Sequence, residues 1–292
     1  MNDGTANKKW SKKKKVIVAV ISVIFALIVL IVVAGVTALN MYCKVSEYTV
    51  TKTEQQVSLI AHRGMSSLAP ENTTASFEQA GKNNYWGAEC DIYRTSDGVW
   101  IVSHDINTYR MMDKSVFIEK STYEDLMKLT VNNGAKLEDY PDLKICSFED
   151  YLKICRQYDM VPIVELKGTN NTEHYDEVVN LVEKYQLDAQ YISFHHENLV
   201  KIRALTDAPV YYLVQEIQQE DIDEALKIDN CGISFNGNKE ENYEVGDNGN
   251  NMIKNCADAG LSLASWTIDK PDVLDKLVDN GVNVITTNCI SY

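Results

Sequence analysis

The sequence lacks several of the patterns that mark large protein classes. Only one uncharged apolar run is long enough to cross a membrane, which excludes a multi-spanning membrane protein. The seven cysteines form no CxxC pair, so zinc-binding spacing is absent, and most are expected to be small core residues. No GxGxxG motif and no internal repeat are found. With 45% apolar and 24% charged residues among 292, the composition is that of an ordinary folded protein.

Basic residues are scarce outside the N-terminal region. Residues 1–44 hold seven lysines and one acid, which leaves 21 basic and 41 acidic residues in 45–292, a net charge of −20. Such an acidic body repels a phosphate backbone, so nucleic-acid binding is disfavoured. The same charge favours the binding of cations.

The long apolar run occupies residues 16–39, 24 positions without a charge. A helix of this length spans about 36 Å at about 1.5 Å per residue, enough for a hydrocarbon core of about 30 Å. A cleaved signal peptide is the alternative, but its apolar region would be only about 7–15 residues long. Four lysines precede the run directly and should stay in the cytoplasm. We therefore predict a basic cytoplasmic tail at 1–15, a transmembrane signal anchor at 16–39, a linker at 40–56, and a body at 57–292 outside the plasma membrane.

The body alternates between strand-like and helix-like segments. Strand-like segments occupy 57–61, 86–93, 161–166, 191–194, 209–214, 231–235, 261–268 and 282–287. Helix-like segments occupy 73–83, 147–158, 173–186, 197–206, 219–228, 249–259 and 271–279. This alternation indicates βαβ crossovers and a parallel sheet, and the length matches the roughly 250 residues of a TIM-type (β/α)8 barrel. A doubly wound open sheet is the alternative.

One stretch interrupts this alternation. A short strand at 99–103 is followed by a polar, irregular region with a helix-like piece at 122–129. We interpret 107–145 as an insertion in the second β/α unit.

Three acids fall near the ends of neighbouring predicted strands, where the active site of a β/α barrel is built. Glu89 and Asp91 lie two residues apart on one strand and therefore point to the same face, and Glu165 lies on the next strand. Such a set of oxygen ligands suits one hard divalent cation, Mg²⁺ or Ca²⁺. Ordinary ion pairs with Arg or Lys are the alternative explanation.

Two histidines follow strands in the same way. His62 comes directly after the first strand and His104 after the short strand at 99–103. Imidazole titrates close to neutral pH, so two of them suit general acid–base catalysis. Arg63 and Lys167 would supply fixed positive charge for a phosphate group. The sequence does not decide which histidine is the acid and which the base.

In their order along the chain, these residues resemble the signature of the glycerophosphodiester phosphodiesterases. The matching motifs are H-R-G at 62–64, P-E-N-T at 70–73, E-x-D at 89–91, T-x-D-G at 95–98, V-S-H-D at 102–105, E-x-K at 165–167, S-F at 193–194 and W-T at 266–267. The matches extend over nearly the whole of 57–292. The resemblance is to a membrane-anchored bacterial member of that family.

The resemblance implies a metal-dependent barrel hydrolase that releases an alcohol and sn-glycerol 3-phosphate from a glycerophosphodiester. A lysolipid is the alternative substrate. By the same resemblance, His62 and His104 are the acid–base pair, and Trp266 is a wall against the glycerol moiety. The remaining implied roles are metal ligation by Glu89, Asp91 and Glu165, and phosphate or substrate contacts by Arg63, Lys167 and Glu71. Asn72 is expected to be structural and to cap the helix that follows it.

The chain departs from the family pattern at its last strand. The family usually carries Thr-Asp there, whereas this chain has Thr287 and Asn288. The missing carboxylate affects either the glycerol contacts or the groups that support the site. The sequence also lacks an extended C-terminal helix, so segment 45–56 or the membrane is expected to help close the barrel. The remaining alternatives are a phospholipase C- or D-like barrel that acts on lysolipids and a non-catalytic barrel that binds the cell envelope.

Overall fold

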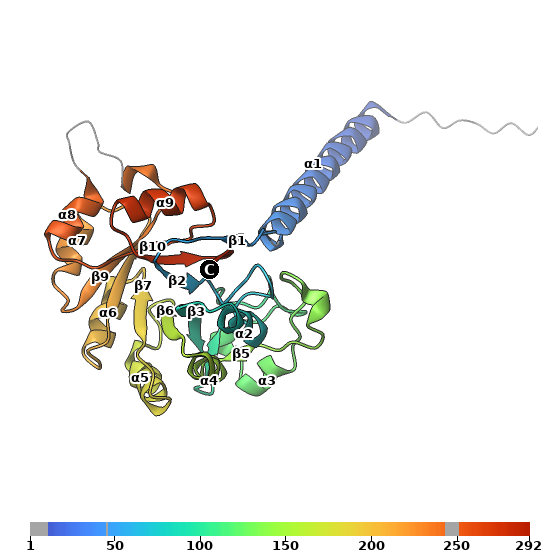
Figure 1. Ribbon diagram of the computed structural model, residues 1–292. Coiled ribbons are helices and arrows are strands. Elements are labelled where there is room, and N and C mark those ends of the chain that lie inside the picture. The colour runs from blue at the N-terminus through green and yellow to red at the C-terminus, as the bar shows by residue number, and fades with distance from the viewer. Residues whose placement is uncertain (1–10, 45, 243–250) are drawn as a thin grey trace, which may run out of the picture. The chain divides into compact units, whose positions relative to one another are not determined.

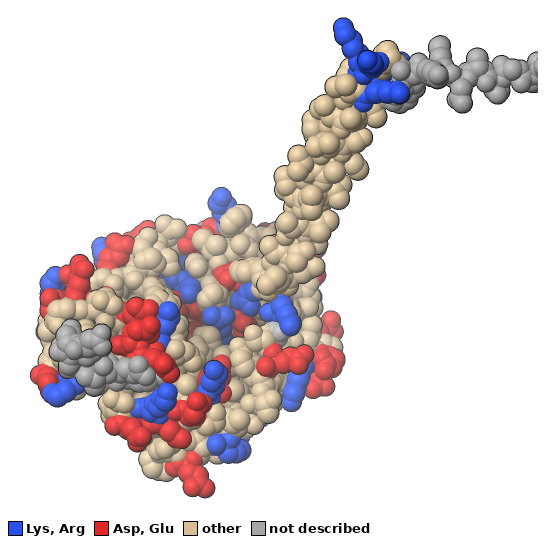
Figure 2. Space-filling view, turned by 90° about the horizontal axis from the view of Figure 1, so that it is seen from above, with Lys and Arg blue, Asp and Glu red and all other residues tan. Residues whose placement is uncertain are grey.

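The computed structural model describes residues 11–44, 46–242 and 251–292, and the chain forms two units, 1–44 and 45–292. The first unit is helix α1 (Lys12–Cys43), which contains the predicted span at 16–39. Its apolar side chains are exposed, and it is long and apolar enough to cross a membrane, a test that a signal sequence also passes. In Figure 2 the lysines gather at one end of this apolar helix. Residues 1–10 of the predicted tail and residue 45 of the predicted linker lie outside the described residues.

The second unit is a closed barrel of eight parallel strands (Figure 1). Strand β2 pairs with β3 on one side and with β11 on the other, so the sheet has no open edge along this wall. The predicted (β/α)8 barrel is therefore confirmed, and a doubly wound open sheet is excluded. The barrel strands are β2 (Ser58–Ala61), β3 (Gly87–Arg94), β6 (Val161–Leu166), β7 (Gln190–Ser193), β8 (Val210–Val214), β9 (Cys231–Asn236), β10 (Leu263–Trp266) and β11 (Val284–Thr287).

Amphipathic helices follow most of these strands and cover the barrel from outside. Helix α4 shows the pattern, because four of its five buried residues, Phe148, Tyr151, Leu152 and Cys155, recur at three, four and seven residues from the first. The Tyr151 hydroxyl donates a 2.7 Å hydrogen bond to the carbonyl oxygen of Ala88 on β3 and so fastens the helix to the wall. The covering helices are α2 (Thr74–Lys82), α4 (Phe148–Tyr158), α5 (Tyr175–Lys184), α6 (His196–Arg203), α7 (Gln219–Ala225), α8 (Met252–Asp258) and α9 (Pro271–Asp279).

Each of these helices overlaps a predicted one, although residues 249 and 250 of the segment predicted at 249–259 lie outside the described residues. The main hydrophobic core lies between the helices and the strands. All seven cysteines are free thiols, and every one except Cys43 is buried.

The connection between β3 and α4 forms a small subdomain of its own. Strand β4 (Trp100–Val102) runs antiparallel to β3, and β5 (Cys146–Ser147) runs antiparallel to β4. A separate hydrophobic cluster, which includes Ile101, Ile118 and Leu126, holds this region together. The other elements here are η1 (Ile118–Lys120), α3 (Tyr123–Met127) and η2 (Leu137–Asp139), and elsewhere in the barrel η3 (Thr172–His174) and η4 (Glu240–Asn242).

The C-terminal residues 288–292, all of which are described, form no helix. Instead β12 (Ile290–Ser291) pairs in parallel with β1 (Thr51–Lys52) in a separate two-stranded sheet. The expectation that segment 45–56 or the membrane closes the barrel was therefore wrong, because β2 and β11 complete the wall by themselves. Within the described residues 46–56, strand β1 instead pairs with β12 close to residue 292.

Candidate active site

Strand register brings the candidate residues to one level of the barrel. Asp91 on β3 is the direct partner of Glu165 on β6. Ala61 at the end of β2 is the partner of Ala88 on one side and of Thr287 on the other. The next residues along the three strands, His62, Glu89 and Asn288, therefore lie at one level, just beyond the carboxyl ends of β2 and β11.

The three predicted metal ligands form one buried cluster. Glu89, Asp91 and Glu165 each offer a carboxylate oxygen, and these oxygens lie within 4.8 Å of one another. Glu89 Oε1 is buried and accepts no hydrogen bond from any residue that the structure describes. An unpartnered buried carboxylate oxygen beside two further acids fits a divalent cation.

The electrostatics of this cluster point the same way. Burial and the charges of Asp91 and Glu165 raise the pKa of Glu89 well above its ordinary value. Burial and Asp91 likewise raise the pKa of Glu165 to about 7. Burial and the neighbouring negative charges both disfavour the charged carboxylates, and a bound cation would offset these shifts.

Asp91 is held in its charged form by three surrounding donors. Lys167 Nζ lies 3.3 Å from Asp91 Oδ1 and 2.7 Å from Glu165 Oε1, and Arg63 Nε lies 3.5 Å from Asp91 Oδ2. Asn72 Nδ2 donates a 2.8 Å hydrogen bond to Asp91 Oδ2. Burial alone would raise the pKa of Asp91, but the charges of Lys167 and Arg63 outweigh it and hold the pKa well below its ordinary value.

The expected role of Asn72 as a helix cap was wrong. Thr73 is the N-cap of α2, and its side chain forms a reciprocal capping box with Ser76. Asn72 instead has a left-handed backbone with φ of 56°, which turns its side chain toward Asp91. Its amide thus belongs to the site.

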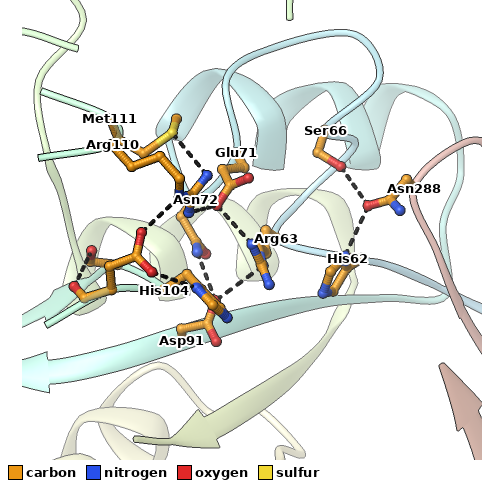
Figure 3. Close-up of polar contacts among 12 residues, drawn as sticks. His62, Arg63, Ser66, Glu71, Asn72, Asp91, His104, Arg110, Met111 and Asn288 are labelled. Carbon is orange, nitrogen blue, oxygen red and sulfur yellow. Dashed lines mark hydrogen bonds and ion pairs between the residues drawn. The ribbon is translucent and has the colours of Figure 1, made fainter. Parts of the chain in front are cut away.

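A chain of charged contacts connects Arg63 with His104 (Figure 3). Glu71 Oε1 lies 2.9 Å from Arg63 Nη1 and 2.6 Å from Arg110 Nη2. Arg110 Nε lies 2.7 Å from Asp105 Oδ2, and Asp105 Oδ1 lies 3.0 Å from His104 Nδ1. Glu71 therefore holds the Arg63 guanidinium in place through an ion pair. Glu71 itself is not among the described residues that line the cavity.

Arg110 is a residue that the sequence analysis missed. It lies in the irregular region between β3 and α4, where no motif or periodicity singles it out. Its guanidinium donates hydrogen bonds to Glu71, the partner of Arg63, and to Asp105, the partner of His104. A residue of the predicted insertion thus helps to hold the side chains of the site in place.

Both predicted acid–base residues line one cavity of about 340 Å³. In the view of Figure 3, Arg63 lies between His62 and His104. His62 Nδ1 lies 2.8 Å from Asn288 Oδ1. Burial and the charge of Arg63 lower the pKa of His62 to about 4, so its ring is neutral at pH 7.

The cavity has a charged side and an apolar side. Arg63, Glu89, Glu165 and Lys167 line the charged side together with the two histidines, and Asp91 is buried next to them. The apolar side includes Phe194 and Trp266, whose rings meet edge to face at 5.5 Å, and the Trp266 indole donates to the carbonyl oxygen of Ser234 at 3.1 Å. One end of a ligand can thus bind through charge and the other through apolar contact. The apolar side is completed by Ile192 and Leu213.

Replacement of Glu71 by glutamine should destabilise the protein by about 1–3 kcal/mol at pH 7. Burial opposes ionisation of Glu71, but Arg63 and Arg110 outweigh it and lower the pKa from 4.5 to about 2. A lowered carboxyl pKa stabilises the fold above the unfolded-state value, and this contribution is lost as the pH falls from about 4.5 to 2. The difference in unfolding free energy between wild type and Glu71→Gln should therefore shrink over that pH range.

Chemical denaturation at a series of pH values measures this difference. Glu78→Gln is the matched control, because Glu78 is partly exposed and its ion-pair partner among the described residues is Lys82, one helical turn away. A gap between wild type and Glu71→Gln that stays constant from pH 7 to pH 3 would contradict the role of the Arg63–Glu71–Arg110 contacts.

Comparisons with known proteins identify the family of the chain. The profile of the glycerophosphoryl diester phosphodiesterase family matches residues 62–291. The chain belongs to this family. Within the family, it is 25% identical over 239 residues to a glycerophosphodiester phosphodiesterase of Caldanaerobacter subterraneus, an alignment that covers 79% of this chain and 93% of that protein.

A mammalian member of the glycerophosphodiester phosphodiesterases matches more closely over a shorter region. Human glycerophosphodiester phosphodiesterase 1 is 37% identical over 120 residues, which are 41% of this chain but only 36% of that protein. Among solved structures, a phosphodiesterase of Oleispira antarctica in complex with the product sn-glycerol 3-phosphate has the same fold. Its TM-score is 0.70 at 24% identity, over 82% of this chain and 96% of that one.

Proposed function

We propose that this family member hydrolyses a glycerophosphodiester to an alcohol and sn-glycerol 3-phosphate in a reaction that depends on a divalent cation. One observation carries the proposal: two histidines and three clustered carboxylates line or adjoin the same cavity at the carboxyl ends of the barrel strands. Acid–base groups beside a cation site are well suited to phosphodiester hydrolysis.

The charged side of the cavity would bind the phosphate. Glu89, Asp91 and Glu165 would hold the cation, Mg²⁺ or Ca²⁺, and when bound it would act as a Lewis acid that offsets charge on the phosphate oxygens. Lys167 now balances the charge of Asp91 and Glu165. A cation there would take over this role, which leaves the Lys167 ammonium available to the phosphate. Arg63 presents its guanidinium on the same side.

The two histidines would carry the protons. One imidazole accepts the proton of the attacking oxygen, which belongs to water or to the neighbouring glycerol hydroxyl, as that oxygen bonds to phosphorus. The other imidazole donates a proton to the alkoxide as its bond to phosphorus breaks. If the glycerol hydroxyl attacks first, the resulting cyclic diester is opened by water, so both routes consume one water and yield the same products.

The proposal is tested by product analysis with the full chain purified in detergent. Glycerophosphocholine, glycerophosphoethanolamine, glycerophosphoglycerol and lysophosphatidylcholine are offered with Mg²⁺ or Ca²⁺, and phosphorus NMR identifies the products. We expect sn-glycerol 3-phosphate from at least one glycerophosphodiester, and none after chelation of the cation. Lysophosphatidic acid from the lysolipid as the only product would establish a phospholipase D-like enzyme that acts on lysolipids instead. Cation binding without turnover of any diester would establish a binding protein.

We also propose that α1 anchors the barrel to the outer face of the plasma membrane, with the N-terminus in the cytoplasm. The length and apolar character of the helix and the lysines at its start support this orientation. A protease added to intact cells should then degrade the barrel, whereas a tag at residue 1 should be cleaved only after lysis. The opposite pattern of protection would contradict the orientation.

A further inference from the structure

The residue that departs from the family pattern contacts a predicted catalytic histidine directly. Asn288 Oδ1 lies 2.8 Å from His62 Nδ1 and accepts a 2.9 Å hydrogen bond from the hydroxyl of Ser66 (Figure 3). On its other side, Asn288 Nδ2 donates a 2.7 Å hydrogen bond to Asp269 Oδ2. Asn288 therefore lies between an imidazole and a carboxylate.

Asp269 fixes which way the Asn288 amide faces. A carboxylate only accepts hydrogen bonds, so the amide nitrogen must face Asp269 and the amide oxygen must face His62. The reversed amide would place two oxygens 2.7 Å apart with no proton between them. Asp269 is itself held by the Asn288 backbone N–H at 2.8 Å and the Thr287 hydroxyl at 3.1 Å, both to Oδ1.

The orientation of the amide in turn fixes the proton on His62. Because Asn288 Oδ1 has no proton to donate, the hydrogen bond forms only if His62 Nδ1 carries one. The neutral ring then has its lone pair on Nε2, at the end of the ring away from Asn288. A histidine that accepts a proton from the attacking oxygen needs this tautomer.

We propose that Asn288 and Asp269 are a positioning pair that holds His62 as the Nδ1–H tautomer, with Nε2 ready to accept a proton in the cavity. The catalytic role of this tautomer rests on the proposed function. The tautomer itself can be measured without any substrate. Asn288 thus replaces the family's carboxylate without loss of an acceptor for His62, because Asp269 orients its amide.

The pattern of hydrogen-bond donors and acceptors can be tested by exchanging the residues at positions 269 and 288. In the double variant Asp269→Asn/Asn288→Asp, the carboxylate at 288 accepts from His62 Nδ1–H and from Ser66. It also accepts from the new amide at 269, whose oxygen accepts from Thr287. Every hydrogen bond of the wild type has a counterpart. In Asn288→Asp alone, two carboxylates would face each other at the 2.7 Å contact, and Asn288→Ala removes the acceptor altogether.

The experiment uses the full chain with its histidines labelled with nitrogen-15, and two-bond proton–nitrogen spectra identify the tautomer of each ring. With only five histidines in the chain, a His62→Gln sample assigns the signal of His62. We expect a protonated Nδ1 in the wild type and in the exchanged variant, and an Nε2–H form or a mixture in Asn288→Ala. In Asn288→Ala we expect kcat to fall about 10- to 100-fold with KM changed much less, and the exchanged variant to recover most of that loss.

Three results would overturn the inference: an Nε2–H tautomer in the wild type, an unchanged tautomer and kcat in Asn288→Ala, or an exchanged variant as impaired as Asn288→Ala. Failure of the proposed function is distinguishable from all three. In that case the wild type turns over no diester, but its His62 still shows the Nδ1–H form and loses it in Asn288→Ala.

Discussion

Alanine at either cavity histidine should lower kcat by about 10²- to 10⁴-fold, the usual contribution of a general acid or base. His62 and His104 line the same cavity, and each has its Nδ1 engaged by a neighbouring side chain, Asn288 for the first and Asp105 for the second. Because those contacts hold the rings in the cavity, alanine would remove the proposed proton-transfer group from its place. Release of sn-glycerol 3-phosphate under saturating substrate and cation measures the effect.

His174→Ala is the matched control for this experiment. His174 lies on η3, contacts Glu173 and Glu177, and is not among the described residues that line the cavity. Its replacement should leave kcat within about twofold of the wild type, as expected for a surface substitution away from the site. Wild-type turnover by both His62→Ala and His104→Ala would refute the acid–base assignment.

Much of this site could be predicted from the sequence because strand periodicity determines it. Glu89 and Asp91 are two residues apart on a strand and must share a face, and the alternation of strands and helices places Glu165 on a neighbouring strand. Residues that follow strands, such as His62, then fall at the same end of the barrel.

The supporting contacts could not be predicted in this way. Arg110 reaches Glu71 and Asp105 from an irregular loop, whose path depends on packing of the insertion rather than on periodicity. Asn72 and Thr73 are both good N-cap residues, and only the backbone at Asn72 decides that Thr73 is the cap.

The same limit applies at the C-terminus. Asn288 was recognised as a departure, but its partner Asp269 lies 19 residues earlier, after a different strand. Nothing in the local sequence pairs the two. Their contact arises from the neighbouring positions of β10 and β11 in the closed sheet.

Glutamine at Glu89 should abolish most of the activity while it leaves the cation-free protein at least as stable as the wild type. Glu89 is buried beside two further acids, and its Oε1 has no hydrogen-bond partner among the described residues. Without a cation, the carboxylate is therefore a cost to the fold, which neutral glutamine relieves. The Arg63 backbone N–H, which donates to Glu89 Oε2 at 2.8 Å, can still donate to the glutamine carbonyl.

With a cation, the order of stability should reverse. A ligand that binds only the folded state stabilises it by about 2.7 kcal/mol at 100 times its Kd, so the Tm of the wild type should rise steadily with Mg²⁺ or Ca²⁺. Glu89→Gln loses a charged ligand, and its Tm should rise much less at the same concentrations. Thermal unfolding in chelator and across a cation titration measures both effects without reference to turnover.

Glu78→Gln again serves as the control, since this partly exposed glutamate on α2 pairs with Lys82 and is not one of the three clustered acids. It should show the cation-dependent rise in Tm of the wild type. An equal rise in the Tm of Glu89→Gln would show that Glu89 is not a ligand of the cation. A Glu89→Gln protein that is less stable than the wild type in chelator would show that Lys167 and Arg63 alone balance the charge of the acid cluster. The opposite signs expected in chelator and in saturating cation are what separate a metal ligand from an ordinary buried ion-pair partner, whose loss destabilises the fold under both conditions.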